Sequence, residues 1–278
     1  MERRVGTWLE SVLLTVSLLV GVAVRPITAQ ERGSVTAPAP QQIPSQTSPV
    51  STPDRSVSLE KLPSNILQDQ KDILLFPTKV VKGHQLWQTL AVIGLTAGLI
   101  AADPHAAPTF RTTNSFNGFN RVFSSTNTGV FIVAVPSILY GVGRLRKDAY
   151  AENSALLAGE AVADGFILAI PSKAITGRKQ PLDYVGNGPY ADSFFIGSHN
   201  PFHSGGFYSV HAMAATAVAT VIAHRYRSHR WVPYVAYGLA GAISFSRMTR
   251  SDHFPSDVFF GGAMGFVIAR YAVLPARN

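Results

Sequence analysis

The stretch SRMTRSDHFPSD, residues 246–257, joins the last two apolar segments of the chain. Proline favours the first position of a helix, so Pro255 predicts that a helix begins there, with His253 just before it. Asp257 then lies within reach of the imidazole, where a carboxylate fixes the tautomer and leaves the other ring nitrogen free to attack. Arg247 adds a planar guanidinium that matches phosphate geometry. The alternative is an ordinary charged loop in which Asp257 only caps a helix.

Two upstream segments carry groups of the same kind. Ser209 and His211 open an alanine-rich run over residues 212–223 with high helix propensity. Backbone N–H groups point outward from the start of a helix and favour an anion there. A cluster of cations over residues 173–179 follows another apolar segment, where a basic helix end alone would indicate only compensation of the helix dipole. Three such sites in one chain favour a shared anion pocket.

In this order the three segments resemble the signature of the type 2 phosphatidic acid phosphatase superfamily, which also includes bacterial nonspecific acid phosphatases and vanadium haloperoxidases. The signature reads Lys-x6-Arg-Pro, then Pro-Ser-Gly-His, then Ser-Arg-x5-His-x3-Asp. The third motif matches at every defined position, the second keeps Ser209 and His211, and the first keeps Lys173 and Pro181. The resemblance covers about residues 70–275.

The resemblance implies a two-step phosphoryl transfer that uses no metal ion and no other cofactor. His253 would attack phosphorus and form a phosphohistidine, while Asp257 orients the ring. His211 would protonate the leaving group and then activate the water that cleaves the intermediate. The residues implied to hold the phosphate oxygens are Lys173, Arg178, Gln180, Ser209, Val210 and Arg247.

The chain departs from the signature at three positions. Gln180 stands in place of the arginine before the proline, which removes a charge and a bidentate donor. Val210 stands in place of glycine and adds a β-branched side chain where the backbone would approach the ligand. Tyr208 replaces the proline of the second motif. These departures leave open a catalytically weakened protein that binds phospholipid or acts as a scaffold.

The composition limits the classes of function. The 278 residues are 46% hydrophobic and 14% charged, include no cysteine and carry a formal net charge of +8. Without cysteine the chain forms no disulfide and no thiolate metal site. The positive charge suits phosphoesters or a membrane surface, whereas the scattering of basic residues over short loops argues against nucleic acid. We therefore expect a phosphorylated lipid or a small phosphoester as the substrate, and a membrane as the setting.

The chain divides into three parts. Residues 1–29 have two arginines before an apolar run and a plausible cleavage position at their end, which is typical of a secretory signal peptide or an uncleaved N-terminal anchor. Residues 30–65 are rich in Ser, Thr, Pro and Gln without hydrophobic periodicity, and predict a disordered linker. Residues 66–278 form the predicted helical phosphatase domain.

Six apolar segments in that domain predict an all-α fold, a six-helix up-and-down bundle. They are rich in glycine and alanine and lack strict alternation, and their lengths of about 16–20 residues approach the length needed to span a bilayer. We expect a membrane-associated bundle, with a soluble bundle as the alternative. Glu160 and Asp164 in the third segment predict polar pairing inside the bundle. The segments lie near residues 85–102, 128–145, 152–171, 209–224, 231–246 and 256–274.

Two features predict opposite topologies. The basic loops at residues 144–147 and 225–230 belong in the cytoplasm by the positive-inside rule, which puts the three motifs outside. A cleaved signal followed by six spans puts them inside. We give the basic loops more weight and expect a protein of the bacterial cell envelope, either in the inner membrane with a periplasm-facing site or in the periplasm.

The expected activity is hydrolysis of a phosphomonoester or of a terminal diphosphate. A lipid-linked substrate fits the apolar segments best. The alternative within the same pocket is a nonspecific periplasmic acid phosphatase that acts on soluble esters.

Overall fold

The computed structural model describes residues 55, 57–81, 83, 85–186, 188–200, 202 and 206–275, and every element in these ranges is helical. The predicted all-α class is confirmed. The signal or anchor predicted for residues 1–29 lies outside the described residues, as does most of the linker predicted for residues 30–65. The last residues of that predicted linker belong to the first described helix, which begins at Leu62.

The six predicted helices are present, but they are not the whole set. They correspond to α4, α6, α7, α8, α9 and α10, whereas α2, α3 and α5 were not predicted, because these helices are short and carry no apolar run. The elements are α2 (Leu62–Leu74), α3 (Phe76–Val81), α4 (Leu86–Thr112), α5 (Asn117–Val122), α6 (Ser125–Arg146), α7 (Ala149–Thr176), η1 (Pro181–Asp183, a 3-10 turn), α8 (Val210–Arg225), α9 (Val232–Thr249), α10 (Pro255–Val267) and η2 (Ile268–Val273, a π-helical turn).

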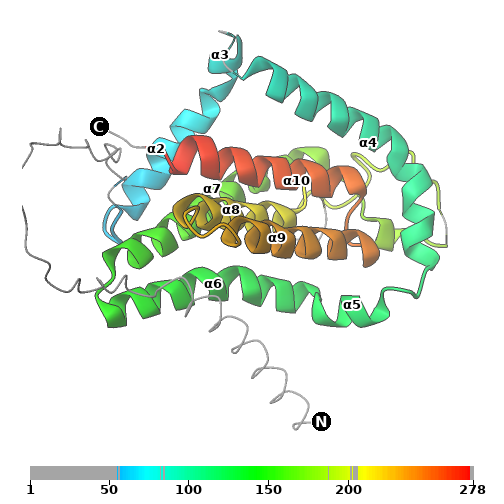
Figure 1. Cartoon of the computed structure of the whole chain (residues 1–278). Coiled ribbons are helices and arrows are strands. Elements are labelled where there is room, and N and C mark those ends of the chain that lie inside the picture. The colour runs from blue at the N-terminus through cyan, green and yellow to red at the C-terminus, as the bar shows by residue number, and fades with distance from the viewer. Residues whose placement is uncertain are drawn as a thin grey trace, which may run out of the picture. The chain divides into compact units, whose positions relative to one another are not determined.

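Helix α4 is longer than the segment 85–102 predicted for it. It runs on to Thr112 through Pro104 and Pro108, and it changes direction in its C-terminal part (Figure 1). An internal proline removes a backbone donor and clashes with the preceding turn, so a bent helix is the expected result. The bend brings the end of α4 over the start of α10, which it contacts.

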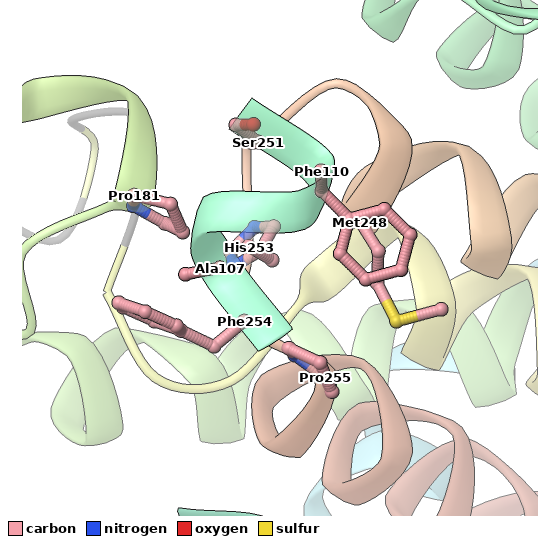
Figure 2. A pocket seen from close by; sticks show the side chains of 8 residues that line it. All are labelled: Ala107, Phe110, Pro181, Met248, Ser251, His253, Phe254 and Pro255. Carbon is pink, nitrogen blue, oxygen red and sulfur yellow. The ribbon is translucent and has the colours of Figure 1, made fainter. Parts of the chain in front are cut away.

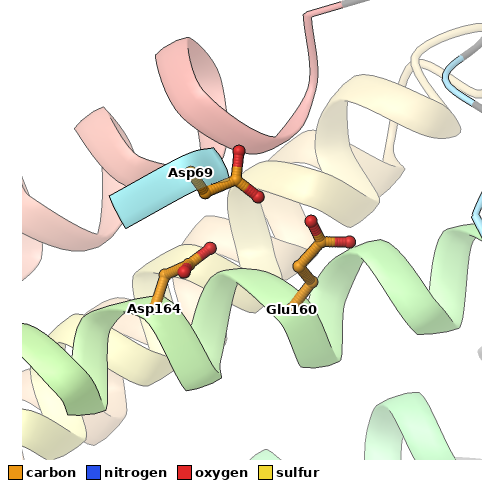
Figure 3. A group of neighbouring side chains, drawn as sticks. All are labelled: Asp69, Glu160 and Asp164. Carbon is orange, nitrogen blue, oxygen red and sulfur yellow. The ribbon is translucent and has the colours of Figure 1, made fainter. Parts of the chain in front are cut away.

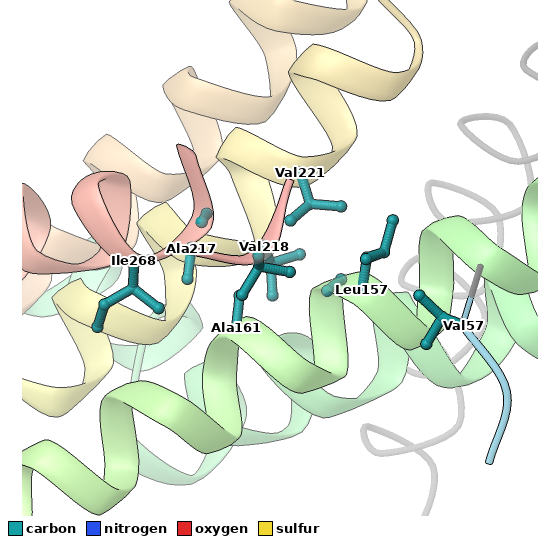
Figure 4. Close-up of a cluster of buried hydrophobic side chains, with 10 residues drawn as sticks. Val57, Leu157, Ala161, Ala217, Val218, Val221 and Ile268 are labelled. Carbon is teal, nitrogen blue, oxygen red and sulfur yellow. The ribbon is translucent and has the colours of Figure 1, made fainter. Parts of the chain in front are cut away.

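Helix α8 is the centre of the bundle. It packs against α7, α9 and α10, and half of its residues are buried alanine or valine. Small side chains let neighbouring helices approach closely on several sides. Figure 4 shows one of the resulting apolar clusters, where α7, α8 and η2 meet; its labelled members are Val57, Leu157, Ala161, Ala217, Val218, Val221 and Ile268.

A very close helix contact in this core joins α8 and α10. A Cβ atom at Gly261 would lie 2.4 Å from the carbonyl oxygen of Ser209, and one at Gly265 would lie 2.1 Å from that of Met213. Both distances are too short for a real contact, and the opposing atoms are backbone atoms that cannot rotate away. The two glycines therefore set the distance between the helices that carry the second and third motifs.

Three described helices are long and apolar enough to cross a membrane, judged by length and composition: Leu86–Thr112, Ser125–Arg146 and Ala149–Asp183. Only 17% of the apolar window of α4 and 22% of that of α6 are buried inside the bundle. Apolar side chains such as Trp87 and Val133 therefore point away from the protein core. An outward apolar face is compatible with membrane insertion.

We predict that Gly265→Ala destabilises the bundle by about 1–3 kcal/mol, the usual cost of overpacking a tight interface. The matched control is Gly262→Ala on the same helix, where the added Cβ would have its nearest neighbour at an ordinary 3.5 Å. Denaturant unfolding in detergent, followed by circular dichroism, measures both variants. Equal stability of the two variants would contradict the close-contact argument.

Candidate functional site

The three motifs lie at one end of the bundle, as the up-and-down order predicts. The C-terminal end of α7 and the start of α8 meet the loop between α9 and α10 there, beside the bent end of α4 (Figure 1). The Ser209 N–H donates to the Asp257 carbonyl at 3.1 Å and so joins the second motif to the third, while the His253 N–H donates to the Arg247 carbonyl at 3.2 Å and closes the loop within the third motif. Residues far apart in the sequence thus share one site.

His253 and Asp257 form the pair that the spacing predicts. Helix α10 begins at Pro255, and the His253 Nδ1 lies 3.4 Å from the Asp257 Oδ2, a contact outside hydrogen-bonding geometry. The same carboxylate oxygen accepts the Phe254 N–H at 3.0 Å. Burial alone would raise the pKa of Asp257, but Arg178 and His253 outweigh it and lower the pKa. Asp257 is thus held as an anion beside the imidazole.

Arg178 is buried between two carboxylates. Its Nη1 donates to Asp257 Oδ1 at 2.5 Å, and its Nη2 donates to Asp103 Oδ2 at 2.6 Å. Phe194 and Phe254 cover the two faces of the guanidinium, with ring centroids 4.3 and 4.4 Å away. This arrangement differs from the predicted phosphate contact, because the charge of Arg178 is already matched inside the protein.

Asp103 is a member of the site that the sequence did not reveal. It is fully buried in α4, and besides Arg178 it accepts hydrogen bonds from the backbone N–H and the side-chain hydroxyl of Ser256. A carboxylate next to a proline at the end of an apolar run is a weak signal of buried pairing. Its partner lies 75 positions away, and no local pattern identifies that partner.

Two predicted phosphate ligands have side chains that remain available. The hydroxyl of Ser209 is buried and has no hydrogen-bond partner. The half-buried amine of Lys173 has no hydrogen bond or ion pair among the described residues, although it lies near enough to Asp257 for the charges to interact. Val210 is the first residue of α8, so its N–H is one of the free donors of a helix start. These groups fit an anion at the start of α8.

Arg247 is fully buried and already has partners. It donates to the hydroxyls of Ser246 and Ser125, to the Phe123 carbonyl and to the Asp252 carboxylate. Burial lowers its pKa to about 10, and Asp252 opposes that shift. Arg247 thus stays charged at neutral pH while it ties α9 to the start of α6.

Gln180 holds the backbone of the third motif. Its Nε2 donates to the Asp252 carbonyl at 2.8 Å, one residue before His253. Leu182 supports the same loop, because its N–H donates to the Ser251 carbonyl at 3.0 Å. The side chain at position 180 is therefore engaged with the loop, unlike the phosphate contact predicted for it.

His211 lies in the first turn of α8, which is not among the three candidate spans. Its Nε2 is 3.3 Å from the Ser125 carbonyl oxygen. Burial and then the charges of Arg247 and His253 lower the pKa of His211 to about 4. The imidazole is therefore neutral at physiological pH and lies close to both basic residues of the third motif.

A small pocket lies directly beside His253. Figure 2 shows it between the end of α4, the segment at Pro181 and the loop before α10. Most of its lining is apolar, including Ala107, Phe110 and Met248. This side of His253 is therefore packed mainly against apolar side chains.

The third segment's acidic residues lie buried inside the bundle, at a distance from the motifs. Asp69 of α2 lies buried against Glu160 and Asp164 of α7 (Figure 3), and one oxygen of each lies within 4.8 Å of the others. The Gln70 Nε2 donates to Asp164 at 2.9 Å. The trio could hold a cation by its geometry, but acidic groups also cluster without one. Asp164 precedes Lys173 by nine residues, about 14 Å along the helix.

The part of the chain that carries the three motifs matches a known protein family. Residues 154–277 match the family model of the PAP2 superfamily. This part of the chain belongs to the PAP2 superfamily. The assignment confirms the resemblance to the type 2 phosphatidic acid phosphatases, and the matched segment contains all three motifs. No curated protein and no solved structure matches the chain.

The PAP2 superfamily includes phosphatases, so the assignment supports a phosphoric monoester hydrolase at the level of the family. The matched segment excludes α4 and α6. Asp103 and Ser125, which bind Arg178 and Arg247, therefore come from outside it.

We predict that Asp103→Asn destabilises the fold by about 3 kcal/mol, because it breaks the buried ion pair of Arg178 with Asp103 and leaves one acceptor oxygen where the two carboxylate oxygens accept from Arg178 and Ser256. Phosphatase activity should fall with it, since Arg178 also holds Asp257. The control is Asp192→Asn, an equal change of charge at an exposed side chain. Urea unfolding and turnover of a phosphomonoester are the measurements, and two variants with the same stability would contradict the prediction.

We predict that His211 makes stability depend on pH between about 6.5 and 4. Because its pKa falls from 6.5 in the unfolded chain to about 4 in the fold, the unfolded state binds the proton more tightly in that window. The free energy of unfolding should therefore decrease as the pH falls through it, by up to about 3 kcal/mol, and level off below pH 4. His211→Gln should remove this component from urea unfolding curves measured at several pH values. An unchanged slope in the variant would show that other groups cause it.

Proposed function

We propose that this protein is a metal-independent phosphatase that hydrolyses a lipid-linked phosphomonoester or terminal diphosphate through a phosphohistidine at His253. The observation that carries the proposal is the His253–Asp257 pair, in which a carboxylate held by Arg178 lies against one ring nitrogen. The other nitrogen is then the nucleophile. The family assignment supports the reaction class.

The surrounding groups supply the charge that phosphoryl transfer requires. In a loose transition state the negative charge is spread over the equatorial oxygens, and catalysis rests on positioned donors. Lys173, Ser209 and the first N–H groups of α8 are the donors that remain available. With Lys173 and neutral donors in this role, the proposed reaction uses no metal ion.

His211 would transfer the proton in both steps. Burial and the charge of Arg247 lower its pKa to about 4, so the resting imidazole is neutral and carries no proton for a leaving group. A phosphate dianion in the site would offset the charge of Arg247 and raise the pKa. Protonation of His211 is thus coupled to substrate binding. After the first step, the neutral ring acts as the base that activates water.

A lipid-linked substrate is favoured over a soluble ester by the surface around the site. The loop between η1 and α8 exposes large apolar side chains. Val185 is 97% and Phe202 84% exposed, and Phe195 and Ile196 are exposed as well. This loop is bound to the end of α7 next to the site, since the Phe195 N–H donates to the Thr176 carbonyl. Exposed apolar loops at one end of a bundle are typical of proteins that contact a lipid interface.

We predict that a radiolabelled lipid phosphomonoester in the presence of EDTA transfers its phosphoryl group to the peptide that contains His253. Rapid quenching and peptide mapping detect the acid-labile product. His253→Ala should abolish labelling and lower turnover by roughly 10³-fold or more, as expected for removal of a nucleophile. His229→Ala, in the loop between α8 and α9, is the matched control and should label normally.

Two outcomes would contradict parts of the proposal. Faster turnover of a soluble aryl phosphate than of a lipid phosphate would favour the nonspecific acid phosphatase. Absence of turnover on both, with phospholipid binding that His253→Ala leaves unchanged, would favour the non-catalytic binding or scaffold protein.

A further inference from the structure

Asp252 places a carboxylate among the cations of the third motif. A single oxygen, Oδ2, accepts hydrogen bonds from the Ser125 hydroxyl at 3.1 Å, the Arg247 Nη1 at 3.2 Å and the Arg250 Nε at 3.1 Å. These donors come from α6, from α9 and from the residue after α9. Three donors around one anionic oxygen are what a phosphate oxygen would also meet.

Arg247 has no N–H group left for a further ligand. A guanidinium has five N–H groups: the Nε donates to Ser246, the Nη1 donates to Ser125 and Asp252, and the Nη2 donates to Phe123 and Ser246. Among the described partners, Asp252 is the only anionic one. An incoming phosphate can replace this carboxylate without loss of a charge-assisted bond, whereas the replacement of any other partner would orphan a buried hydroxyl or carbonyl.

The Asp252 side chain can leave while its backbone stays. The Asp252 N–H donates to the Arg247 carbonyl at 3.0 Å, and the Asp252 carbonyl accepts the Gln180 Nε2. The side chain is 16% exposed and so has access to solvent. Rotation about its χ1 bond therefore moves the carboxylate out of the site without moving His253.

We propose that Asp252 is a resident anion of the phosphate site, whose carboxylate occupies the position of one phosphate oxygen until substrate displaces it. This inference rests on the proposed function of the site as a phosphate pocket. A tethered carboxylate competes at a high effective concentration. The apparent affinity for phosphate is then the intrinsic affinity multiplied by the fraction of time that the carboxylate leaves the site free.

Calorimetric titration of the full-length protein in detergent with inorganic phosphate tests the inference. Asp252→Asn and Asp252→Ala should bind phosphate roughly tenfold more tightly than the unmodified protein, because the competitor is gone. Asp192→Asn changes the net charge equally at an exposed side chain and should bind phosphate as the unmodified protein does.

The opposite results separate this inference from the proposed function. Weaker or unchanged binding in both Asp252 variants, with clear binding in the unmodified protein, would mean that Asp252 only positions Arg247, and would overturn the inference alone. Absence of phosphate binding in every protein would overturn the inference and the phosphate pocket together.

A second measurement needs no variant. Carbodiimide labelling read by mass spectrometry reports the exposure of each carboxylate, with the exposed Asp192 as the internal reference for reagent strength. Phosphate should increase the labelling of Asp252 relative to Asp192, because displacement moves the carboxylate into solvent. Unchanged or decreased labelling of Asp252 at saturating phosphate would overturn the inference.

Discussion

The ion pairs of Arg178 with Asp103 and Asp257 are the constraint on which the rest of the site depends. They lie almost fully out of solvent, where an unpaired charge would be very costly and only a fully satisfied network is stable. Arg178 meets that requirement through two carboxylates, two serine hydroxyls and two aromatic faces. The network ties the bend of α4, the end of α7 and the start of α10 together. It thereby sets the position of Asp257 and, through Asp257, that of His253.

This network explains why the site could be predicted only in part. The pairing of His253 with Asp257 and the helix starts at Ser209 and Pro255 follow from short-range spacing, and the structure contains them. The partners of Arg178 and Arg247 do not follow from it. Asp103 and Ser125 lie 75 and 122 positions from their arginines, so whether a basic residue faces a ligand or a buried carboxylate is decided by long-range packing.

The fold shows the same division between local and long-range effects. Apolar runs rich in glycine and alanine were sufficient to predict the helices that carry the motifs. The continuation of α4 through Pro104 and Pro108 opposes local helix propensity. The continued helix is favoured because Asp103, one residue before the first proline, accepts hydrogen bonds from Arg178 and Ser256 in the core. Burial of charged partners thus overrides the local signal at the point where α4 covers the site.

The charge balance of the site follows from these contacts. Arg178 faces Asp103 and Asp257, and Arg247 and Arg250 share Asp252. Among the described residues no ion pair is found for Lys173 or for Lys179, whose amine lies over the ring of Tyr184. The number of basic residues in the motifs therefore overstates the positive charge that an incoming anion meets. In the proposed mechanism Lys173 and the start of α8 hold the phosphate dianion. Arg247 would add its charge only after the Asp252 carboxylate gives way, because its five N–H groups already have partners.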